Sequence, residues 1–235
     1  MRALAIVHQR DAGPGVFADA LRAKGAELDY WMPPESGAPA RPLTEYDAVM
    51  VFGGAMHADQ DESHPWLRAE KALLRDLLER GAPMLGVCLG AQLVADAAGA
   101  PPRRARRPEI GWHEVEVTPE GRRDPLIGPL APRFEAFQWH SYEFLLPHGA
   151  TPLARSGGCL QAYRTGDAWG IQFHAEVTRD DAEAWIADYR SDEDAVRIGV
   201  DPEALRQRTG RAIDAWNEVG RGLCERFVDA VATRA

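Results

Sequence analysis

The stretch Pro83-Met-Leu-Gly-Val-Cys-Leu-Gly-Ala-Gln92 decides the fold. Its first residues are a short apolar run typical of a buried strand, and the residues from Gln92 to Ala98 favour a helix. Cys88 stands at the junction of the two, with a glycine two residues away on either side. We therefore expect a sharp strand-to-helix turn that exposes the sulfur. The first N–H groups of the helix would point at it and favour a thiolate.

Apolar runs alternate with helical patterns through the first half of the chain. We expect strands over residues 3–7, 27–31, 48–52 and 84–87, and helices over 16–24 and 67–79. Continuously apolar strands that alternate with helices predict a parallel sheet covered on both faces. Ligands bind such sheets at the carboxyl ends of the strands.

The pattern changes after Gly111. Short strands with period-two alternation are expected over 112–117, 134–139, 152–156, 160–164 and 168–173, which predicts an antiparallel section added to the parallel core. Helices are expected over 180–189, 202–209 and 211–231. We expect one domain over 1–235, with a core of about 1–180 and a C-terminal helical extension of about 180–235.

Composition argues against several classes of protein. A net charge of -9 disfavours a nucleic-acid partner. No apolar run approaches the roughly 20 residues that span a bilayer, so no membrane partner is expected. The three cysteines, Cys88, Cys159 and Cys224, show neither a disulfide framework nor zinc spacing. We expect a soluble, cytoplasmic protein without metal or cofactor, and its oligomeric state stays open.

A candidate base lies far from Cys88 in the sequence. The apolar run 168–173 ends at His174, and Glu176 follows two residues later. This spacing lets the carboxylate orient one ring nitrogen while the other faces a thiol, as in a catalytic triad. The alternatives are a surface His–Glu pair and a Cys88 that serves only as a small buried apolar residue.

An oxyanion site is expected beside the sulfur. The backbone N–H of Leu89 lies just past the turn, and the loop Gly53-Gly54 lets backbone approach a substrate closely. Because Gly53-Gly54, Cys88 and His174 each follow a strand, they can meet on one edge of the sheet.

The two motifs, Gly86 to Gln92 and Gly170 to Glu176, together resemble the class I glutamine amidotransferases, in particular stand-alone proteins similar to the amidotransferase part of GMP synthase. Supporting stretches lie at 51–56, 61–67, 108–112, 138–140 and 161–164. The resemblance covers roughly residues 45–180. It implies a flavodoxin-like three-layer α/β/α sandwich with a mostly parallel central sheet.

The resemblance also implies roles for individual residues. A γ-glutamyl thioester would form on Cys88, with His174 as base and then acid and Glu176 as its orienting carboxylate. Substrate contacts would come from Gln92 and from backbone near Gly53, Gly54 and Leu89. His140 corresponds to a histidine near the same pocket.

Two positions depart from the family pattern. The usual His-Pro-Glu is His174-Ala-Glu176, which loses the stiffness of proline but keeps both functional groups. The usual His-Gly-Asp is His140-Ser-Tyr142, which predicts a bulkier pocket mouth and a different choice of substrate.

Two polar stretches fall outside these motifs. Residues 57–64 hold histidines and acids without regular ligand spacing, and we expect a solvated loop rather than a metal site. The basic run Arg103-Arg-Ala-Arg-Arg107 is expected to be a solvated loop; the alternative is a site that docks an acidic partner or steers an anionic substrate.

Three functions remain open at this stage. The chain could hydrolyse glutamine and pass ammonia to a separate synthetase, or hydrolyse a small γ-glutamyl amide with water as acceptor. It could also be a catalytically silent binding or regulatory protein on the same fold.

Overall fold

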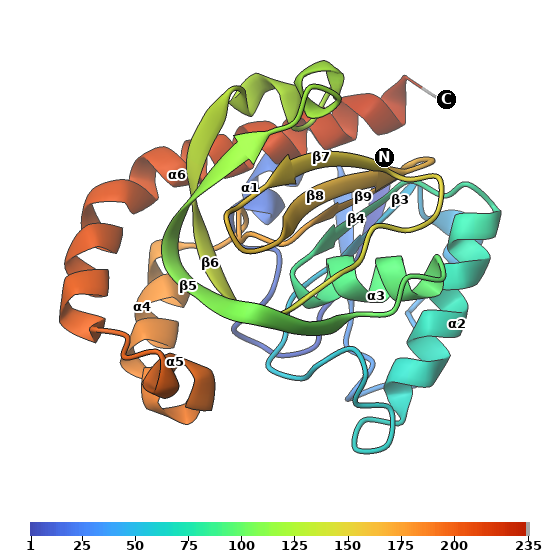
Figure 1. Cartoon of the computed structure of the whole chain (residues 1–235). Helices are drawn as coiled ribbons and strands as arrows, with labels where there is room; N and C mark the ends of the chain where they lie inside the picture. Colours follow the sequence, from blue (N-terminus) through green and yellow to red (C-terminus); the bar gives the residue numbers. More distant parts are fainter. Residues whose placement is uncertain (234–235) are drawn as a thin grey trace.

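The computed structural model describes residues 1–233, and a nine-stranded sheet forms its centre (Figure 1). The strands are β1 Arg2–Ile6, β2 Glu27–Trp31, β3 Ala48–Val51, β4 Met84–Val87, β5 Arg103–Val117, β6 Arg133–Glu143, β7 Thr151–Arg155, β8 Leu160–Thr165 and β9 Ala168–Ile171. The helices are α1 Gly15–Ala23, α2 Trp66–Glu79, α3 Leu89–Ala97, α4 Arg179–Ala187, α5 Glu193–Arg197 and α6 Pro202–Ala232.

The sheet is half parallel and half antiparallel. Its strand order is β2-β1-β3-β4-β9-β8-β7-β5-β6. The first five strands pair in parallel, and the four remaining pairings in the described chain are antiparallel. The predicted antiparallel section is therefore confirmed, but the expectation of a mostly parallel sheet is wrong. Strands β5 to β9 follow one another without a crossover helix, and only crossover connections make neighbouring strands parallel.

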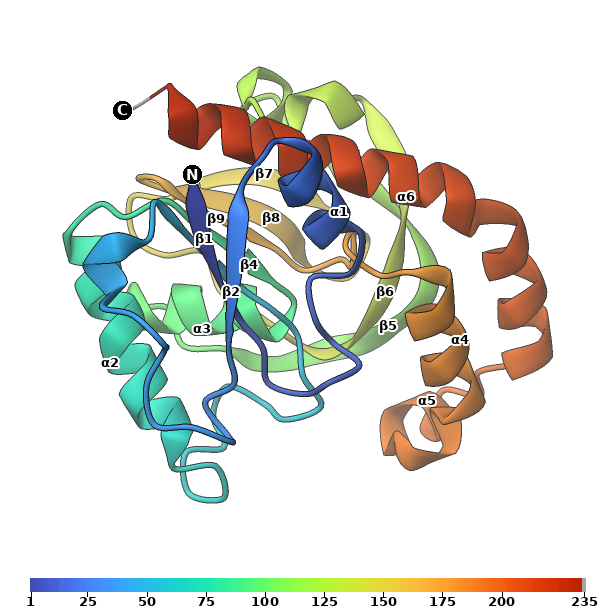
Figure 2. The same ribbon diagram turned by 180° about the vertical axis from the view of Figure 1, so that it is seen from behind.

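Helices cover both faces of the sheet, so the α/β/α sandwich is confirmed (Figures 1 and 2). Strand β1 shows why. Its Ala3 and Ala5 join a core cluster with residues of α1, α4 and α6, whereas Leu4 and Ile6 join a second cluster with α2 and α3. Alternate side chains of a strand point to opposite faces, so a fully apolar strand needs a helical layer on each side.

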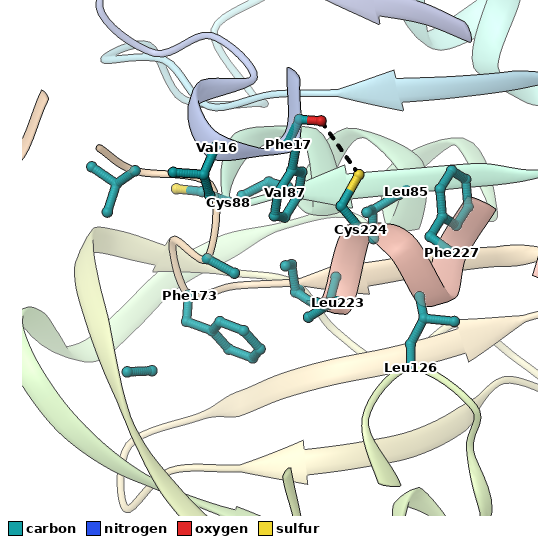
Figure 3. Packing of buried hydrophobic residues seen from close by; sticks show 14 of the residues in the cluster. Val16, Phe17, Leu85, Val87, Cys88, Leu126, Phe173, Leu223, Cys224 and Phe227 are labelled. Carbon is teal, nitrogen blue, oxygen red and sulfur yellow. Dashed lines mark hydrogen bonds between the residues drawn. The ribbon is translucent and has the colours of Figure 1, made fainter. Parts of the chain in front are cut away.

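Helix α6 belongs to the first of these clusters. Leu223, Cys224 and Phe227 of α6 are fully buried, and Figure 3 shows them beside Phe17 of α1. The Cys224 Sγ lies 3.6 Å from the carbonyl oxygen of Phe17. The C-terminal helix therefore supplies core residues that cover the same face as α1.

Three local expectations are wrong. Helix α6 runs through Gly210 as one helix instead of two, because buried residues of its flanking turns pack on the sheet and outweigh the roughly 1 kcal/mol that one glycine costs. The run 103–107 is the start of β5, not a loop. The short helix α5 had no sequence prediction. The expected loop over 57–64 is present, and no helix within residues 1–233 is both long and apolar enough to cross a membrane.

Candidate active site

Cys88 sits on a strained turn between β4 and α3. Its φ of 52° is the one positive value at a non-glycine residue in the described part of the chain, and such backbone strain concentrates at functional sites. The Cys88 N–H donates to the carbonyl of Ile171 at 2.8 Å, and the Cys88 carbonyl accepts from Gln92 at 3.1 Å. The cysteine is thus fixed by the sheet on one side and by the helix on the other.

The glycines of this turn are needed for space. A Cβ on Gly90 would lie 1.9 Å from the carbonyl oxygen of Val51, and one on Gly86 would lie 2.7 Å from backbone atoms of Gly90. Neither glycine has a positive φ. They therefore let α3 approach β3 and β4 closely, which brings the helix N-terminus and its positive dipole end up to the sulfur.

His174 and Glu176 lie in the loop after β9. Their side chains are buried and the Nδ1–Oε1 distance is 2.7 Å. The loop backbone is anchored at both residues: the His174 N–H donates to the carbonyl of Phe137 at 2.9 Å, and the Glu176 carbonyl accepts from Val16 at 2.8 Å. The expected carboxylate–imidazole pair is therefore formed.

Helix α6 also holds this loop. The Trp216 indole N–H donates to the carbonyl of His174, and the Asn217 side-chain amide donates to the carbonyl of Val177, both at 2.7 Å. Ala175 between them is completely buried. These contacts restrain the backbone at a position where the related sequences have a proline.

The charge state of His174 follows from its neighbours. Burial by itself lowers the pKa of His174, but the Glu176 carboxylate and then the Cys88 sulfur outweigh it and raise the pKa to about 10. Because Nδ1 faces Glu176, Nε2 is the ring nitrogen left for the cysteine. The imidazole is therefore protonated at neutral pH, which suits it to pair with a thiolate.

The other two cysteines have a different environment. Burial raises the pKa of Cys224 to about 12 and that of Cys159 still further. Both side chains are thus thiols at neutral pH, and neither lines the main cavity.

A cavity of about 630 Å³ lies over Cys88 and collects most of the predicted site residues. Those that line it are Gly54, Cys88, Leu89, Gln92, His140 and His174. Within residues 1–233, the backbone N–H groups of Gly54 and Leu89 donate to no protein acceptor. Two such donors beside a nucleophile suit a developing oxyanion.

Gly53 lies behind the cavity wall. A Cβ added there would lie 3.3 Å from Cε1 of His174 and 3.9 Å from Cβ of Cys88. We expect Gly53→Ala to displace the imidazole and to lower kcat/KM about 10- to 100-fold, because small misplacements of reacting groups are costly. Gly37→Ala is the matched control, since nothing lies within 4 Å of a Cβ there. Wild-type turnover by Gly53→Ala would show that the ring is not confined in this way.

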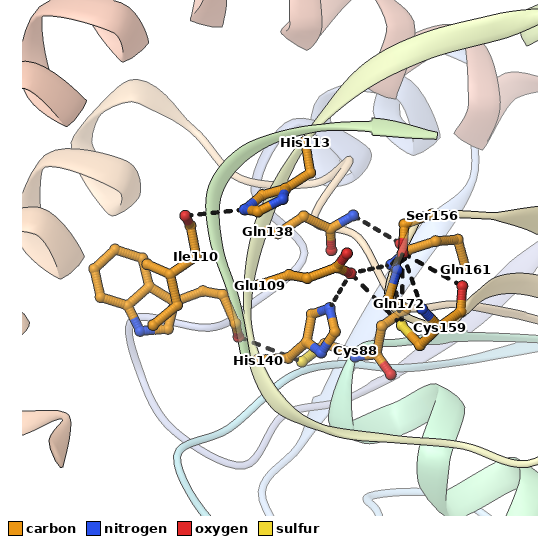
Figure 4. A network of polar contacts seen from close by, with 12 residues as sticks. Cys88, Glu109, Ile110, His113, Gln138, His140, Ser156, Cys159, Gln161 and Gln172 are labelled. Atoms are coloured by element: carbon orange, nitrogen blue, oxygen red, sulfur yellow. Dashed lines mark hydrogen bonds and ion pairs between the residues drawn. The ribbon is translucent and has the colours of Figure 1, made fainter. Parts of the chain in front are cut away.

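Sequence reasoning missed a buried polar cluster behind the cavity (Figure 4). Ligand atoms of Glu109, His140 and Cys159 lie within 4.8 Å of one another. The Gln161 side-chain amide donates to Oε2 of Glu109 at 2.7 Å and to Sγ of Cys159 at 3.3 Å. Because an N–H donor already points into the space between these atoms, hydrogen bonds account for the cluster without a cation. The only sequence signal was Gln161 in a strand that is otherwise apolar.

His140 belongs to both the cluster and the cavity. Its Nδ1 donates to the carbonyl of Tyr142 at 3.0 Å, and its Nε2 lies 3.3 Å from Oε2 of Glu109. Burial raises the pKa of Glu109, but hydrogen bonding and the charge of His140 outweigh it and hold this pKa below its usual value. Gln92 is similarly engaged, since its amide donates to the carbonyl of Tyr142 at 3.0 Å.

The cavity mouth contains the second departure from the family pattern. The Tyr142 ring stacks on His57 with the ring centres 4.0 Å apart. Arg104 pairs with Asp194 of α5 at 2.5 Å, and Arg103 pairs with Glu143 at 2.8 Å. Two residues of the basic run are therefore occupied within the chain itself.

Comparison with known proteins gives the family. The sequence model of the family described as glutamine amidotransferase class-I matches residues 16–188. The glutamine amidotransferase-like protein YfeJ of Salmonella typhimurium is 30% identical over 192 residues, which cover 79% of this chain and 80% of YfeJ. The crystal structure of a glutamine amidotransferase from Thermotoga maritima matches with a TM-score of 0.87 at 33% identity, over 97% of this chain and 98% of that one.

Two further relatives have more specific names. A subunit of the glutamine-hydrolyzing GMP synthase of Sulfurisphaera tokodaii is 33% identical over 143 residues, 59% of this chain and 72% of the relative. The gamma-glutamyl-L-1-hydroxyisopropylamide hydrolase of a Pseudomonas species is 30% identical over 147 residues, 58% of this chain, which spans about half (49%) of the hydrolase. On the family match and the YfeJ match, this chain belongs to the class I glutamine amidotransferase family.

Proposed function

We propose that this chain hydrolyses a γ-glutamyl amide through a thioester on Cys88. The observation that carries the proposal is the meeting of a strained cysteine with a buried His174–Glu176 pair at one cavity. Nucleophile, base and orienting carboxylate come from two loops 86 residues apart, and the fold places both at the carboxyl ends of β4 and β9. This is the arrangement that nucleophilic acyl transfer requires.

The first half-reaction would form the thioester. The Cys88 thiolate attacks the γ-carbonyl carbon, and the carbonyl oxygen becomes an oxyanion that accepts hydrogen bonds from the N–H groups of Gly54 and Leu89. The His174 imidazolium then gives its Nε2 proton to the amide nitrogen. The carbon–nitrogen bond breaks, and ammonia or an amine leaves.

The second half-reaction would release glutamate. His174, now neutral, takes a proton from water while that water attacks the thioester carbon. The resulting oxyanion uses the same two donors, and its collapse breaks the carbon–sulfur bond. Glu176 stays ionised throughout and holds the ring by its Nδ1.

The size of the cavity favours an amide that carries an amine larger than ammonia. Beyond Cys88 the cavity is walled by Trp185 of α4 and by Asp192, which precedes α5 and accepts from the Trp139 indole at 2.9 Å. Glutamine is a small ligand for a space of about 630 Å³. The relative from Pseudomonas, named for hydrolysis of a γ-glutamyl alkylamide, supports the same substrate class.

Ammonia transfer to a separate synthetase is the second candidate. It is favoured by the similarity to the GMP synthase subunit of Sulfurisphaera tokodaii. In that case glutamine would be the substrate and a partner chain would supply the acceptor.

One experiment tests the reaction and separates the two candidates. The purified chain is incubated with glutamine and with γ-glutamyl amides of larger amines, and both glutamate release and the intact mass are measured. We expect a γ-glutamyl adduct that maps to Cys88, with faster turnover of the larger amides. Rapid turnover of glutamine alone supports ammonia transfer, and absence of both adduct and glutamate contradicts the proposed chemistry.

A further inference from the structure

A second buried histidine–carboxylate pair lies beneath the glycine loop. His8 follows β1, and Glu70 projects from α2; both side chains are completely inaccessible to solvent. The Nε2 of His8 lies 3.0 and 3.1 Å from the two carboxylate oxygens of Glu70. Its Nδ1 lies 3.0 Å from the carbonyl oxygen of Phe52 and 3.1 Å from that of Gly53. The proposed mechanism makes no use of this pair.

The surroundings of His8 determine its protonation. All its ring-nitrogen partners are oxygens that accept hydrogen bonds, so both nitrogens donate, and a ring that donates from both is an imidazolium. The Glu70 carboxylate balances the charge, and the His8 ring stacks on Trp66 with centres 5.4 Å apart. Burial lowers the pKa of His8, but Glu70 and the two carbonyls outweigh it and raise this pKa overall.

The contact with Gly53 has a geometric consequence. The carbonyl of Gly53 and the N–H of Gly54 belong to the same peptide unit, which is planar with its C=O and N–H pointing in opposite directions. A donor that fixes the carbonyl on the His8 side therefore aims the N–H to the other side. Gly54 lines the cavity with Cys88 there. The loop is packed tightly on this support, since a Cβ on Gly54 would lie 3.0 Å from Cβ of His8.

We propose that His8 and Glu70 are positioning residues that aim the Gly54 N–H at the oxyanion of the reaction. The inference rests on the proposed acyl transfer at Cys88. The imidazolium also polarises the peptide unit that it binds, because hydrogen bonds in a chain strengthen one another, and this makes the Gly54 N–H a stronger donor. Neither residue touches the substrate, so their effect is confined to reactions that form an oxyanion.

Two reactions of Cys88 separate this role from a structural one. Acylation by p-nitrophenyl acetate passes through an oxyanion, whereas alkylation by iodoacetamide does not. We expect His8→Gln to lower the ratio of acylation to alkylation rates about 10- to 100-fold, less than complete loss of one oxyanion donor. Glu70→Gln should lower it in the same direction. His8→Asn, whose amide nitrogen can replace Nδ1, should recover most of the ratio.

The control is Asp96→Asn, which makes the same carboxylate-to-amide change in a partly buried pair with Lys71, away from the glycine loop. It should leave the ratio unchanged. Thermal melting of each variant shows whether it is folded, and Glu70→Gln decides if His8→Gln does not fold. An unchanged ratio in a folded His8→Gln or Glu70→Gln overturns the positioning role, as does an equal fall in both reactions. A wild-type chain that is alkylated but not acylated overturns the proposed function itself.

Discussion

Replacing Cys88 with alanine is expected to abolish turnover of γ-glutamyl amides, with a fall in kcat of at least about 10⁴-fold. No other cysteine can take over, because Cys159 and Cys224 are buried thiols outside the cavity. The substitution removes one sulfur atom and leaves the backbone unchanged, so we expect the melting temperature to stay close to that of the wild type. Steady-state assays with matched thermal melts measure both quantities.

The same residue can be tested without an amide substrate. A glutamine-like electrophile, such as a diazoketone, should label Cys88 alone, as read by peptide mass spectrometry after limited exposure. Cys88→Ala should then take up no label. Labelling of Cys159 or Cys224 at a comparable rate, or undiminished turnover by Cys88→Ala, would show that the nucleophile lies elsewhere.

His174→Asn is expected to cost nearly as much as loss of the sulfur, since triad members act as a unit. Glu176→Gln should cost less, about 10²- to 10⁴-fold, because the ring keeps a hydrogen-bond acceptor at Nδ1 but loses the stabilising charge. Single-turnover rates of thioester formation measure both effects. An equal loss in the two variants would mean that Glu176 does more than orient the ring.

The pH dependence gives an independent check on the pair. The imidazolium of His174 persists until the pH rises through its folded pKa of about 10, so acylation should decline above that value. Glu176→Gln removes the main group that raises this pKa, and the alkaline decline should move to lower pH. The sign for stability is the same: the charged pair stabilises the fold fully below the unfolded pKa of about 6.5, and the stabilisation is lost as pH rises toward 10. An unmoved alkaline limb contradicts the assignment.

Local patterns predicted most of the fold. Strands 27–31 and 84–87 have the predicted bounds, because short apolar runs bounded by turn residues have few alternatives. The start of β5 was missed since four arginines in five residues resemble a solvated loop. Its place in the sheet depends on pairing with β6 and on acidic partners such as Asp194, which is 90 residues away.

The site was predictable where chemistry and local geometry coincide, and less so elsewhere. Cys88 and the 174–176 pair each carry a signal within a few residues. The His8–Glu70 pair joins residues 62 positions apart, so no short window contains it. One clue was available: Glu70 interrupts the apolar stripe of α2 that Leu67, Leu74 and Leu77 form, and an acid on a buried stripe needs a partner.

The grip of α6 on the loop after β9 ties reactivity to the far end of the polypeptide. Trp216 and Asn217 lie beyond the residues 16–188 that match the family, yet they restrain the backbone that carries the imidazole. Local unfolding of that last helix would release the loop while the central strands stay paired. The chain would then lose its chemistry at a milder denaturant concentration than its sheet, and a shortened version ending before residue 202 would be an inert scaffold.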